Sequence, residues 1–277
     1  MPSLVGSEMC IRDRCCTPTE YRMMAKLSNL NDYHLELLHS AVSAGEPLNR
    51  EVVEQFKNNF NLTVRDGYGQ TESTLLIGFL KDTEPRPGSM GKGIPGSFVT
   101  IIDDDGNEVP PQTKGNIAVP LDLPALFKGY YKDEERTKAA AAGYYYVTGD
   151  LAHKDEDGYF WFEGRRDDII ISSGYTIGPF EVEDALTNHP AVKECAVVAS
   201  PHEIRGNIVK AFIILQNNYE GNDELVKELQ TFCKNEVAPY KYPRAIEFVD
   251  DLPKTNSGKI RRVELRDAEI AKYNNRD

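Results

Sequence analysis

The pattern of apolar and polar positions predicts a change of structure along the chain near residue 165. Between residues 86 and 165, apolar runs of strand length are separated by turn sequences. The runs are FVTIID, NIAVP and YFWFEG, and the turns include DDDGNE and DEDG. This alternation predicts a small antiparallel β unit. After Gly164 the pattern predicts strands alternating with helices, which indicates an α+β domain of its own.

Three segments have the apolar period of a helix. The stretch 49–60 begins with Asn49, a plausible N-cap, and places four apolar residues on one helical face, namely Val52, Val53, Phe56 and Phe60. The stretch 179–190 begins with Pro179, which favours the first turn of a helix, and the predicted helix stops before Pro190. Residues 222–237 carry apolar residues at helical spacing. Three runs after Gly164 are predicted as strands, namely DDIIIS, ECAVVAS and IVKAFIIL.

These patterns divide the chain into three segments. Residues 1–14 have no clear period and no link to the rest of the chain, so they are left unassigned and resemble an artefact more than folded protein. Residues 15–167 and residues 168–277 are the two predicted domains, with a boundary near Arg165–Asp168. The expected fold class is therefore mixed α/β (α+β).

The composition is that of a soluble globular protein, with 40% apolar and 27% charged residues among 277. A net charge of −12 argues against a general nucleic-acid or anionic-membrane binder, so any anionic ligand must be held by local basic groups and backbone amides. The longest apolar runs are strand-sized, which predicts no transmembrane segment. No apolar signal-peptide core follows Met1, and a cytoplasmic location is expected.

The stretch GYGQTES at 67–73 is the first candidate for phosphate chemistry. Two glycines around a tyrosine, followed by Gln-Thr-Glu, predict a tight turn that exposes backbone amides together with polar side chains. Thr71 and these amides can bind phosphate, and the Glu72 carboxylate can hold Mg²⁺ on the phosphates. An ordinary glycine-rich loop with a solvated glutamate has the same pattern, so this stretch alone leaves both interpretations open.

Two shorter stretches are compatible with binding a nucleoside. SAGEPLN at 43–49 is a small-residue turn against which a flat ring can lie, although a simple capped turn has the same sequence. TGD follows the strand-like YYYV, so Asp150 is expected at a strand end, where its carboxylate can accept both hydroxyls of a ribose. A strand-ending aspartate in an ordinary turn is the alternative.

The segment GRRDDIIISSGYTIGPFEVE at 164–183 has the most specific sequence. Arg165 can pair with phosphate or ribose oxygens through its forked guanidinium. Asp167 and Asp168 lie where the β unit passes into the last domain, which is a place for a hinge. The residues SSG at 172–174 form a small loop that can line a narrow passage. A strand, a turn and a capped helix without further function would have the same pattern.

Lys259 lies in LPKTNSGKIRR, near the end of the chain. A Walker A loop needs a glycine five residues before the Gly-Lys pair and Ser or Thr after it, whereas Pro253 and Ile260 stand at those positions. Two interpretations remain. The lysine belongs to a solvated basic cluster with Arg261 and Arg262, or a loop delivers its ammonium to a reacting phosphate.

The combination of these stretches resembles the adenylate-forming acyl-CoA synthetases, most closely the medium-chain acyl-CoA ligases. The resemblance covers roughly residues 15–275 and rests on motifs in family order: TPTEYRMM, SAGEPLN, GYGQTES, PGSMGKGIPG, YVTGDLA, GRRDDIIISSGYTIGPFEVE, PYKYPRAIEFVDDLPKT and SGKIRR. It implies the C-terminal part of the adenylate-forming fold. This part is a partial large domain with a small β-barrel-like unit, followed by a mobile α+β C-terminal domain.

The resemblance implies a reaction in two steps. A small carboxylate such as a fatty acid attacks the α-phosphate of ATP, which gives an acyl-adenylate and pyrophosphate. The thiol of CoA then displaces AMP and forms the thioester. The implied cofactors are therefore ATP, Mg²⁺ and coenzyme A.

The resemblance also implies a role for each matching residue. Lys259 would bridge the acyl carboxylate and the α-phosphate during adenylation, Glu72 would bind Mg²⁺, and Asp167 would be the hinge of the C-terminal domain. The residues implied at the nucleotide are Gly45, Glu46, Pro47, Asp66, Gly67, Tyr68, Gly69, Gln70, Thr71, Asp150 and Arg165. Those implied at CoA are Ser173, Gly174, Tyr175, Arg205, Lys234, Tyr242 and Arg244. Plain surface charge is the alternative for Arg205 and Lys234.

Two features depart from the family pattern. The residue after SGY is usually arginine in this subfamily, and here it is Thr176, which puts one phosphate or CoA contact in doubt. The family's N-terminal domain, with its Ser/Thr/Gly-rich phosphate loop and much of the acyl pocket, has no match in this sequence. We therefore expect a fragment that lacks the N-terminal half and is inactive alone. A carrier-protein-loading adenylation domain and a non-catalytic nucleotide-binding remnant are the alternatives.

Overall fold

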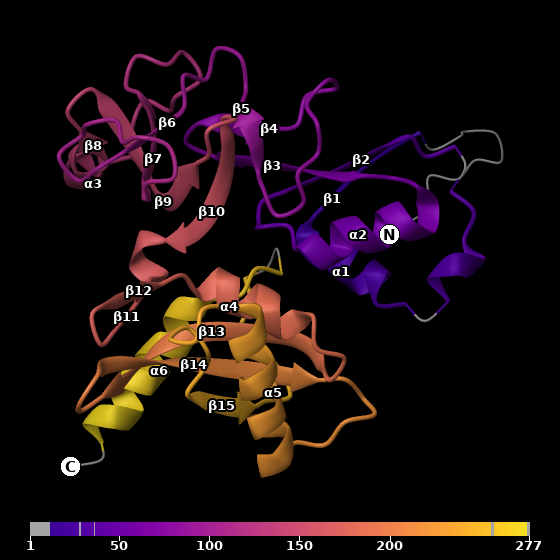
Figure 1. Cartoon of the computed structure of the whole chain (residues 1–277). Helices are drawn as coiled ribbons and strands as arrows, with labels where there is room; N and C mark the ends of the chain where they lie inside the picture. Colours follow the sequence, from indigo (N-terminus) through magenta and orange to yellow (C-terminus); the bar gives the residue numbers. More distant parts are fainter. Residues whose placement is uncertain (1–11, 28, 36, 256–257, 276–277) are drawn as a thin grey trace. The chain divides into compact units, whose positions relative to one another are not determined.

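The computed structural model describes residues 12–27, 29–35, 37–255 and 258–275, which divide into two compact units (Figure 1). Unit 1 comprises the described residues up to Thr148 together with Ala152–Phe162. Unit 2 comprises Gly149–Leu151 and the described residues from Glu163 onward. This division falls shortly before the boundary predicted at residue 167. Residues 13 and 14, which the sequence left unassigned, belong to strand β1, and residues 1–11 lie outside the described part.

Unit 1 contains one large sheet with the order β1-β2-β3-β4-β5-β10-β9-β7-β6, with β8 paired to β9. Its elements are β1 (Asp13–Cys16), α1 (Pro18–Ala25), η1 (Leu30–Asp32), β2 (Ser40–Ala44), α2 (Arg50–Phe60), β3 (Val64–Gln70), β4 (Thr74–Gly78), β5 (Gly91–Gly93), β6 (Thr100–Ile102), β7 (Gly115–Pro120), α3 (Glu134–Ala139), β8 (Ala141–Ala142), β9 (Tyr145–Lys154) and β10 (Tyr159–Arg165). β9 contributes Gly149–Leu151 to unit 2 before it returns to unit 1, and β10 ends in unit 2.

The first part of this sheet is parallel and packs against helices. β1 pairs with β2 and β2 with β3 in parallel, and α1 and α2 cover a core that includes Tyr21, Ala41, Val52, Phe56 and Val64. The rings of Tyr21 and Phe56 meet edge to face with centroids 5.2 Å apart. The helix predicted over 49–60 is confirmed, and it buries the apolar face that its spacing indicated.

The second part is antiparallel, as the alternation of apolar runs and turns predicted. β3 pairs with β4, β4 with β5, β5 with β10, and β6 with β7, all antiparallel. The predicted runs FVTIID, NIAVP and YFWFEG correspond to β6, β7 and β10. Inward side chains of these three strands and of β4 form one apolar cluster that includes Leu76, Ile77, Ile101, Ile117 and Phe160.

Unit 2 is an α+β domain with a sheet of order β12-β11-β14-β13, in which β15 also pairs with β14. Its elements are η2 (Arg166–Asp168), β11 (Ile170–Ser172), β12 (Tyr175–Ile177), α4 (Pro179–Thr187), β13 (Val192–His202), β14 (Gly206–Leu215), α5 (Asp223–Glu236), β15 (Ala245–Phe248) and α6 (Arg262–Asn274). The predicted helices over 179–190 and 222–237 and the strands ECAVVAS and IVKAFIIL are confirmed.

The two faces of this sheet are covered by different helices because side chains alternate along a strand. Cys195 and Val197 of β13 join a core with α4 and α5. Ala196 and Val198, on the opposite face, pack in a second cluster with Leu265 of α6. Helices therefore lie on both sides of β13.

The prediction that DDIIIS is a buried strand is wrong in part. Asp167 and Asp168 lie in the short helical turn η2, and β11 begins only at Ile170. Ile170 is buried, but Ile171 is 60% exposed. The alternation of side chains brings only one face of this three-residue strand to the core, so a run of three isoleucines does not bury all of them.

In the described part of the chain, no helix combines the length and apolarity needed to cross a membrane.

Candidate functional site

The stretch GYGQTES divides between a strand and a turn. The structure corrects the single tight turn predicted from the glycines, because Gly67–Gln70 lie in β3 and only Thr71–Ser73 form the turn to β4. Gly69 is required at an irregularity of the β3–β4 ladder. A Cβ there would stand 2.0 Å from the carbonyl oxygen of Thr74. Thr71 is exposed at the turn.

Glu72 is held by a tyrosine that the sequence did not indicate. The hydroxyl of Tyr130 donates to Oε1 of Glu72 at 3.0 Å, and the amide of Phe127 donates to its carbonyl at 2.7 Å. The guanidinium of Arg136 lies 3.9 Å from the centre of the Tyr130 ring. Only the tyrosine pair of FKGYYKDEE offered a sequence signal. Oε2 of Glu72 has no hydrogen-bond partner among the described residues.

This arrangement fits a Mg²⁺ ion held partly by phosphates. The described residues contain no group of three or more His, Cys, Asp or Glu side chains that could hold a metal. Mg²⁺ commonly uses one or two carboxylates together with substrate phosphates. A single oriented carboxylate with one free oxygen is therefore sufficient from this chain.

Gln70 braces the strand that carries these residues. Its Nε2 donates to the carbonyl of Thr148 at 2.9 Å, and the hydroxyl of Tyr146 donates to its Oε1 at 3.2 Å. Thr148 in turn donates to the carbonyl of Ile117 at 3.0 Å. The Gln70 side chain, implied at the nucleotide phosphates, thus joins β3 to β9 within unit 1.

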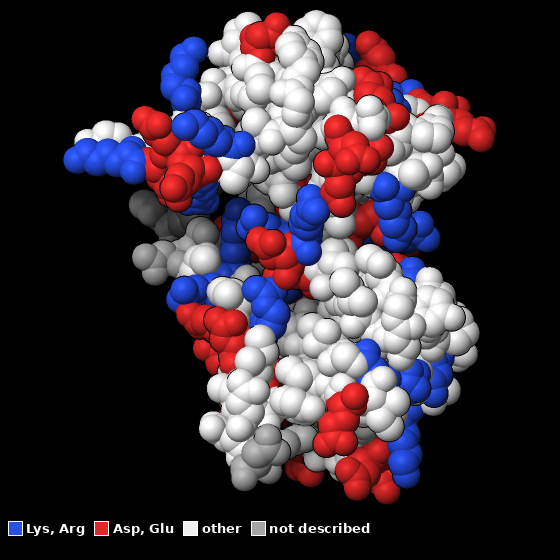
Figure 2. All heavy atoms as spheres, turned by 90° about the vertical axis from the view of Figure 1, so that its left-hand side faces the viewer, with Lys and Arg blue, Asp and Glu red and all other residues white. Residues whose placement is uncertain are grey.

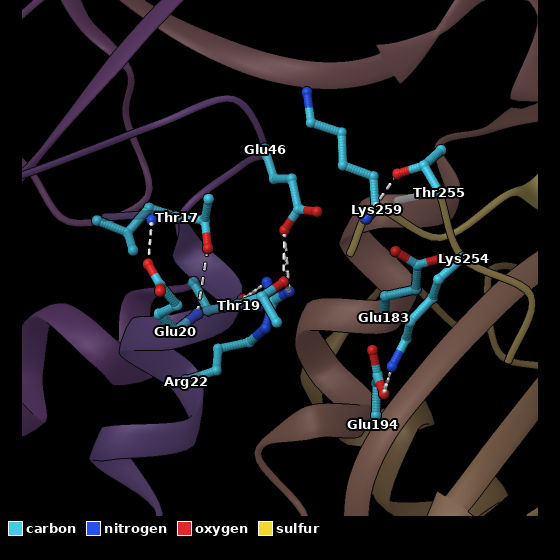
Figure 3. Close-up of polar contacts among 12 residues, drawn as sticks. Thr17, Thr19, Glu20, Arg22, Glu46, Glu183, Glu194, Lys254, Thr255 and Lys259 are labelled. Atoms are coloured by element: carbon cyan, nitrogen blue, oxygen red, sulfur yellow. Dashed lines mark hydrogen bonds and ion pairs between the residues drawn. The ribbon is translucent and has the colours of Figure 1, made fainter. Parts of the chain in front are cut away.

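Glu46 fixes the SAGEPLN turn to α1 (Figure 3). Its Oε2 accepts from the Thr19 hydroxyl at 2.8 Å and from Arg22 at 3.1 Å. Arg22 also donates to the side-chain oxygen of Asn49 at 3.0 Å, so Asn49 stands at the N-cap position of α2 without a capping bond from its side chain. Gly45 has a φ of 100°, a backbone conformation that favours glycine. The turn is therefore rigid, which suits a surface for a flat ring.

Asp66 is a half-buried residue that lines a small cavity in unit 1. It accepts from the amides of Gly67 at 2.9 Å and Leu48 at 3.4 Å. The cavity is lined mainly by apolar residues, with Arg86 on its wall. Burial raises the pKa of Asp66 from 3.8 to about 7, although the two amide hydrogen bonds oppose this rise.

Replacing Asp66 with asparagine should change the pH dependence of stability. The wild-type carboxyl is neutral in both states below pH 3.8. As the pH rises from 3.8 to about 7, the carboxyl ionises in the unfolded state but stays mostly neutral in the folded state, so the free energy of unfolding of the wild type falls progressively. Asp66→Asn cannot ionise, so the free energy of unfolding of the variant should gain on that of the wild type by about 2–4 kcal/mol between pH 4 and pH 8. Urea unfolding followed by the fluorescence of Trp161, the single tryptophan, measures this in unit 1.

The control for this prediction is Asp82→Asn, which removes an exposed carboxylate from the same unit. Its stability relative to the wild type should not depend on pH to a comparable extent. A pH-independent difference for Asp66→Asn would show that Asp66 is ionised in the folded protein throughout this range.

Asp150 and Arg165, both implied at the ribose, are brought together in unit 2. Oδ1 of Asp150 lies 3.7 Å from Nε of Arg165, and the side chain of Asp150 is 10% exposed against 61% for Arg165. The predicted strand end at Asp150 is wrong. β9 runs on to Lys154 because LAHK, with Ala152 buried, continues the alternation of buried and half-buried positions. Asp150 therefore projects from within a strand.

The turn at Ser173 and Gly174 is a two-residue hairpin between β11 and β12. Both residues have positive φ, 50° and 81°, which is the backbone of the hairpin turn that favours glycine. Arg205 holds the turn twice, since its guanidinium donates to the Ser173 hydroxyl at 3.1 Å and its carbonyl accepts from the Ser173 amide at 3.1 Å. Thr176 is exposed on β12.

Two aromatic contacts gather the remaining residues implied at CoA. Tyr175 stacks on Tyr240, with centroids 4.4 Å apart and ring planes at 19°. Lys234 lies 4.1 Å from the centre of the Tyr242 ring, and Arg244 donates to the Tyr242 hydroxyl at 3.0 Å. Tyr240 was not among the residues predicted from the sequence, where its position two residues before Tyr242 was the only signal. Stacked rings and cations beside an aromatic face are both suited to a nucleotide.

Lys259 projects from a small bridged turn in unit 2 (Figure 3). Thr255 donates from its amide to the Lys259 carbonyl at 2.8 Å, and its hydroxyl accepts from the Lys259 amide at 3.1 Å. Lys254 pairs with Glu194 at 2.7 Å, whereas the exposed ammonium of Lys259 has no partner among the described residues. The backbone is thus held while the ammonium stays available.

The predicted hinge residue Asp167 lies in η2 and is tied to α6. Its carbonyl accepts from Arg266 at 2.6 Å, and the carboxylate of Asp168 pairs with the same guanidinium at 3.1 Å. On the face of the molecule drawn in Figure 2, basic and acidic side chains are intermixed.

Comparison with protein families gives two matches in the order of the sequence motifs. Residues 9–131 match the AMP-binding enzyme family, and residues 181–259 match the AMP-binding enzyme C-terminal domain. An acyl-CoA ligase of Bacillus subtilis, YtcI, is 67% identical over 255 residues, which are 92% of this chain and 48% of that protein. The mouse mitochondrial acyl-coenzyme A synthetase ACSM3 is 49% identical over 261 residues, 92% of this chain and 45% of that protein.

Solved structures give the same result. The anthranilate CoA ligase AuaEII, in complex with anthranoyl-AMP, superposes with a TM-score of 0.85 at 35% identity. The superposition covers 93% of this chain and 50% of the AuaEII chain. A benzoate CoA ligase from Burkholderia xenovorans superposes with a TM-score of 0.81 at 33% identity, covering 94% and 52%. The chain thus spans about half the length of the relatives that it matches. The likeness confirms the predicted fold class.

Proposed function

Because this chain belongs to the AMP-binding enzyme family, we propose that it forms the C-terminal half of an ATP-dependent acyl-CoA ligase. The complete enzyme joins a carboxylic acid, a medium-chain fatty acid in our proposal, to CoA through an acyl-adenylate. The relatives named acyl-CoA ligase and acyl-coenzyme A synthetase support this activity. The cytoplasmic location expected from the sequence stays a prediction.

The single observation that carries the proposal is the state of Lys259. Its backbone is held on both sides, and its ammonium is exposed and unpaired among the described residues, whereas the ammonium of Lys254 nearby is neutralised by Glu194. A cation kept free on a braced turn is suited to meet an anion that arrives from outside the chain. In adenylation two anions, a carboxylate and an α-phosphate, must approach each other. An ammonium between them stabilises the charge that develops.

The other residues have distinct roles in this proposal. Glu72, oriented by Tyr130, would hold Mg²⁺, which when bound neutralises phosphate charge. Asp150 would accept the ribose hydroxyls, and Arg165 beside it would add a donor. The turn held by Arg205 and the cations around Tyr242 would contact CoA for the second step. Asp167 would be the hinge.

A carboxylate-dependent exchange of pyrophosphate into ATP tests the first step on the full-length enzyme that contains this chain. The exchange should require both a fatty acid and Mg²⁺, and added CoA should then yield acyl-CoA. Exchange without acyl-CoA formation, together with loading of a carrier protein, would assign the enzyme to the other adenylating class. No exchange with any carboxylate would contradict the proposal.

The 277-residue chain by itself should form no acyl-CoA. It spans about half the length of its relatives, and no match to the family's phosphate loop was found in its sequence. The measurement is thioester formation by the purified chain, compared with the full-length enzyme at equal concentration. Clear turnover by the 277-residue chain would show that it carries a complete active site.

A further inference from the structure

An ion pair between half-buried Arg262 and buried Glu183 lies three residues beyond Lys259, at the start of α6. Oε1 of Glu183 accepts from Nε of Arg262 at 2.9 Å, and Oε2 accepts from a terminal nitrogen of the same guanidinium at 2.5 Å. The Glu183 side chain is 7% exposed. Oε1 also accepts from the backbone amide of Val197 at 2.8 Å. The pair therefore has the forked, two-bond geometry that fixes both partners in place.

The pair joins the two helical layers of unit 2 around the edge of its sheet. Glu183 belongs to α4, which packs on one face, and Arg262 begins α6, which packs on the other. β13 is the last strand of the sheet order, and the Val197 amide bound by Glu183 belongs to this strand. One carboxylate thus ties together α4, the edge strand and the first residue of α6.

The stability of α6 alone does not explain an arginine at this position. A cation at a helix N-terminus opposes the helix dipole and costs about 0.3–1 kcal/mol. Burial disfavours the charged guanidinium, yet Glu183 outweighs this effect and raises the pKa of Arg262. Pairing with Glu183 therefore offsets the unfavourable position of a cation at the N-terminus of α6. This indicates that the pair determines where the helix starts.

The chain between Arg262 and Lys259 is short and held. Three residues span at most about 11 Å, so the place of Arg262 limits the place of Lys259. The amide of Arg261 donates to the carbonyl of Pro253 at 2.8 Å, and Lys254 and Ile260 form an antiparallel bridge. The Lys254–Glu194 pair holds the other side of the turn (Figure 3). A shift of the helix start would therefore pass directly to Lys259.

We propose that Glu183 is a positioning residue for Lys259. Through Arg262 it fixes the first turn of α6 and with it the backbone that presents the Lys259 ammonium. The catalytic part of this inference rests on the proposed function of Lys259. The structural part, that Glu183 controls the order of this turn, is independent of any activity.

Amide hydrogen exchange at Thr255 and Lys259 in the 277-residue chain tests the structural part. Glu183→Gln keeps the size of the side chain but loses its charge, and it should speed exchange at these two amides by about tenfold or more. The matched control is Glu269→Gln on α6, the helix that Arg262 begins. It disrupts another buried cluster, in which the Glu269 carboxylate accepts from the Ser200 hydroxyl at 2.8 Å and from the Lys210 ammonium at 2.8 Å. The control should leave exchange at Thr255 and Lys259 within about twofold of the wild type.

Two outcomes would overturn the structural part. Exchange at Thr255 and Lys259 that does not change in Glu183→Gln would show that another contact orders the turn. An equal increase in both variants would show only a general loosening of unit 2. If circular dichroism shows that Glu183→Gln does not fold, the same exchange measurement on Arg262→Lys tests the structural part instead. This variant keeps the charge but loses the fork, and it should raise exchange at the same two amides selectively.

The catalytic part is measured as a split between kcat and KM in the full-length enzyme. Glu183→Gln should lower kcat of the adenylation step by about 10–100-fold, since a misplacement of about 1 Å can have such an effect, with the KM for ATP within about threefold of the wild type. The kcat of Arg262→Lys should lie between that of the wild type and that of Glu183→Gln. An unchanged kcat would overturn the catalytic part. A wild-type enzyme without adenylation would contradict the proposed function instead, and the exchange experiment would still decide on Glu183.

Discussion

Lys259→Ala should lower the rate of acyl-adenylate formation by the full-length enzyme by on the order of 10²–10³-fold. The lysine ammonium is the group that the structure leaves exposed and unpaired on a braced turn, among the residues it describes. It should act when the carboxylate oxygen meets the α-phosphate and negative charge gathers around phosphorus. An alanine cannot supply this charge, and water is a poor substitute because it must reorient. Pyrophosphate exchange measures the loss directly.

The second half-reaction separates this role from a general defect. Thioester formation from chemically prepared acyl-adenylate and CoA does not need the attack on ATP, so Lys259→Ala should retain it within about tenfold of the wild type. Lys227→Ala, which removes an exposed lysine from α5 of the same unit, should leave both rates unchanged. Equal loss in both half-reactions would instead indicate that Lys259 supports the fold of the turn.

The secondary structure of this chain could be predicted where one period dominates. Residues 49–60 and 222–237 form the predicted helices α2 and α5, because each presents one apolar face to a core. The alternating runs of residues 86–165 became antiparallel strands for the same reason. The prediction was wrong where several apolar residues stand together. Ile171 is exposed because β11 is short and brings only one face to the core.

The candidate site was predicted as a set of motifs, but the contacts that hold it were not. Asp150 with Arg165, and Ser173 with Arg205, were each named from the sequence, and the structure shows that they are partners. Their pairing depends on strand register, which motif spacing does not contain. Tyr130 binds Glu72 from a loop 58 positions away, so no local pattern could reveal it.

Buried charges were the least predictable part of the site. One of the two interpretations left open from the sequence placed Arg262 in a solvated basic cluster with Lys259 and Arg261. It is instead paired with Glu183, whose side chain is buried on another helix. Charged residues are seldom buried unless they are paired, so the partner must be known before the burial can be inferred. Tertiary packing supplies that knowledge, and the sequence does not.

Glu72→Gln should abolish most of the Mg²⁺ dependence of nucleotide binding and lower adenylation by on the order of 10²-fold. Glutamine has the size of glutamate, and its amide oxygen can still accept a hydrogen bond from the Tyr130 hydroxyl. The variant therefore removes charge with little change of shape. Titration of nucleotide affinity against Mg²⁺, with and without EDTA, gives a readout that does not depend on turnover. The affinity of the variant should respond far less to the metal than that of the wild type.

Tyr130→Phe provides a graded version of the same experiment. It keeps the Glu72 carboxylate but removes the hydroxyl that lies 3.0 Å from Oε1, so the carboxylate remains charged and is less well oriented. Outer partners of metal ligands commonly account for 10–100-fold in metal affinity, and we expect about tenfold more Mg²⁺ to be needed for half-maximal adenylation. Glu135→Gln on α3, an exposed carboxylate of the same unit, should change nothing. A Mg²⁺ requirement that is unchanged in Glu72→Gln would mean that the metal is held elsewhere, and Tyr130→Phe would then also behave as wild type.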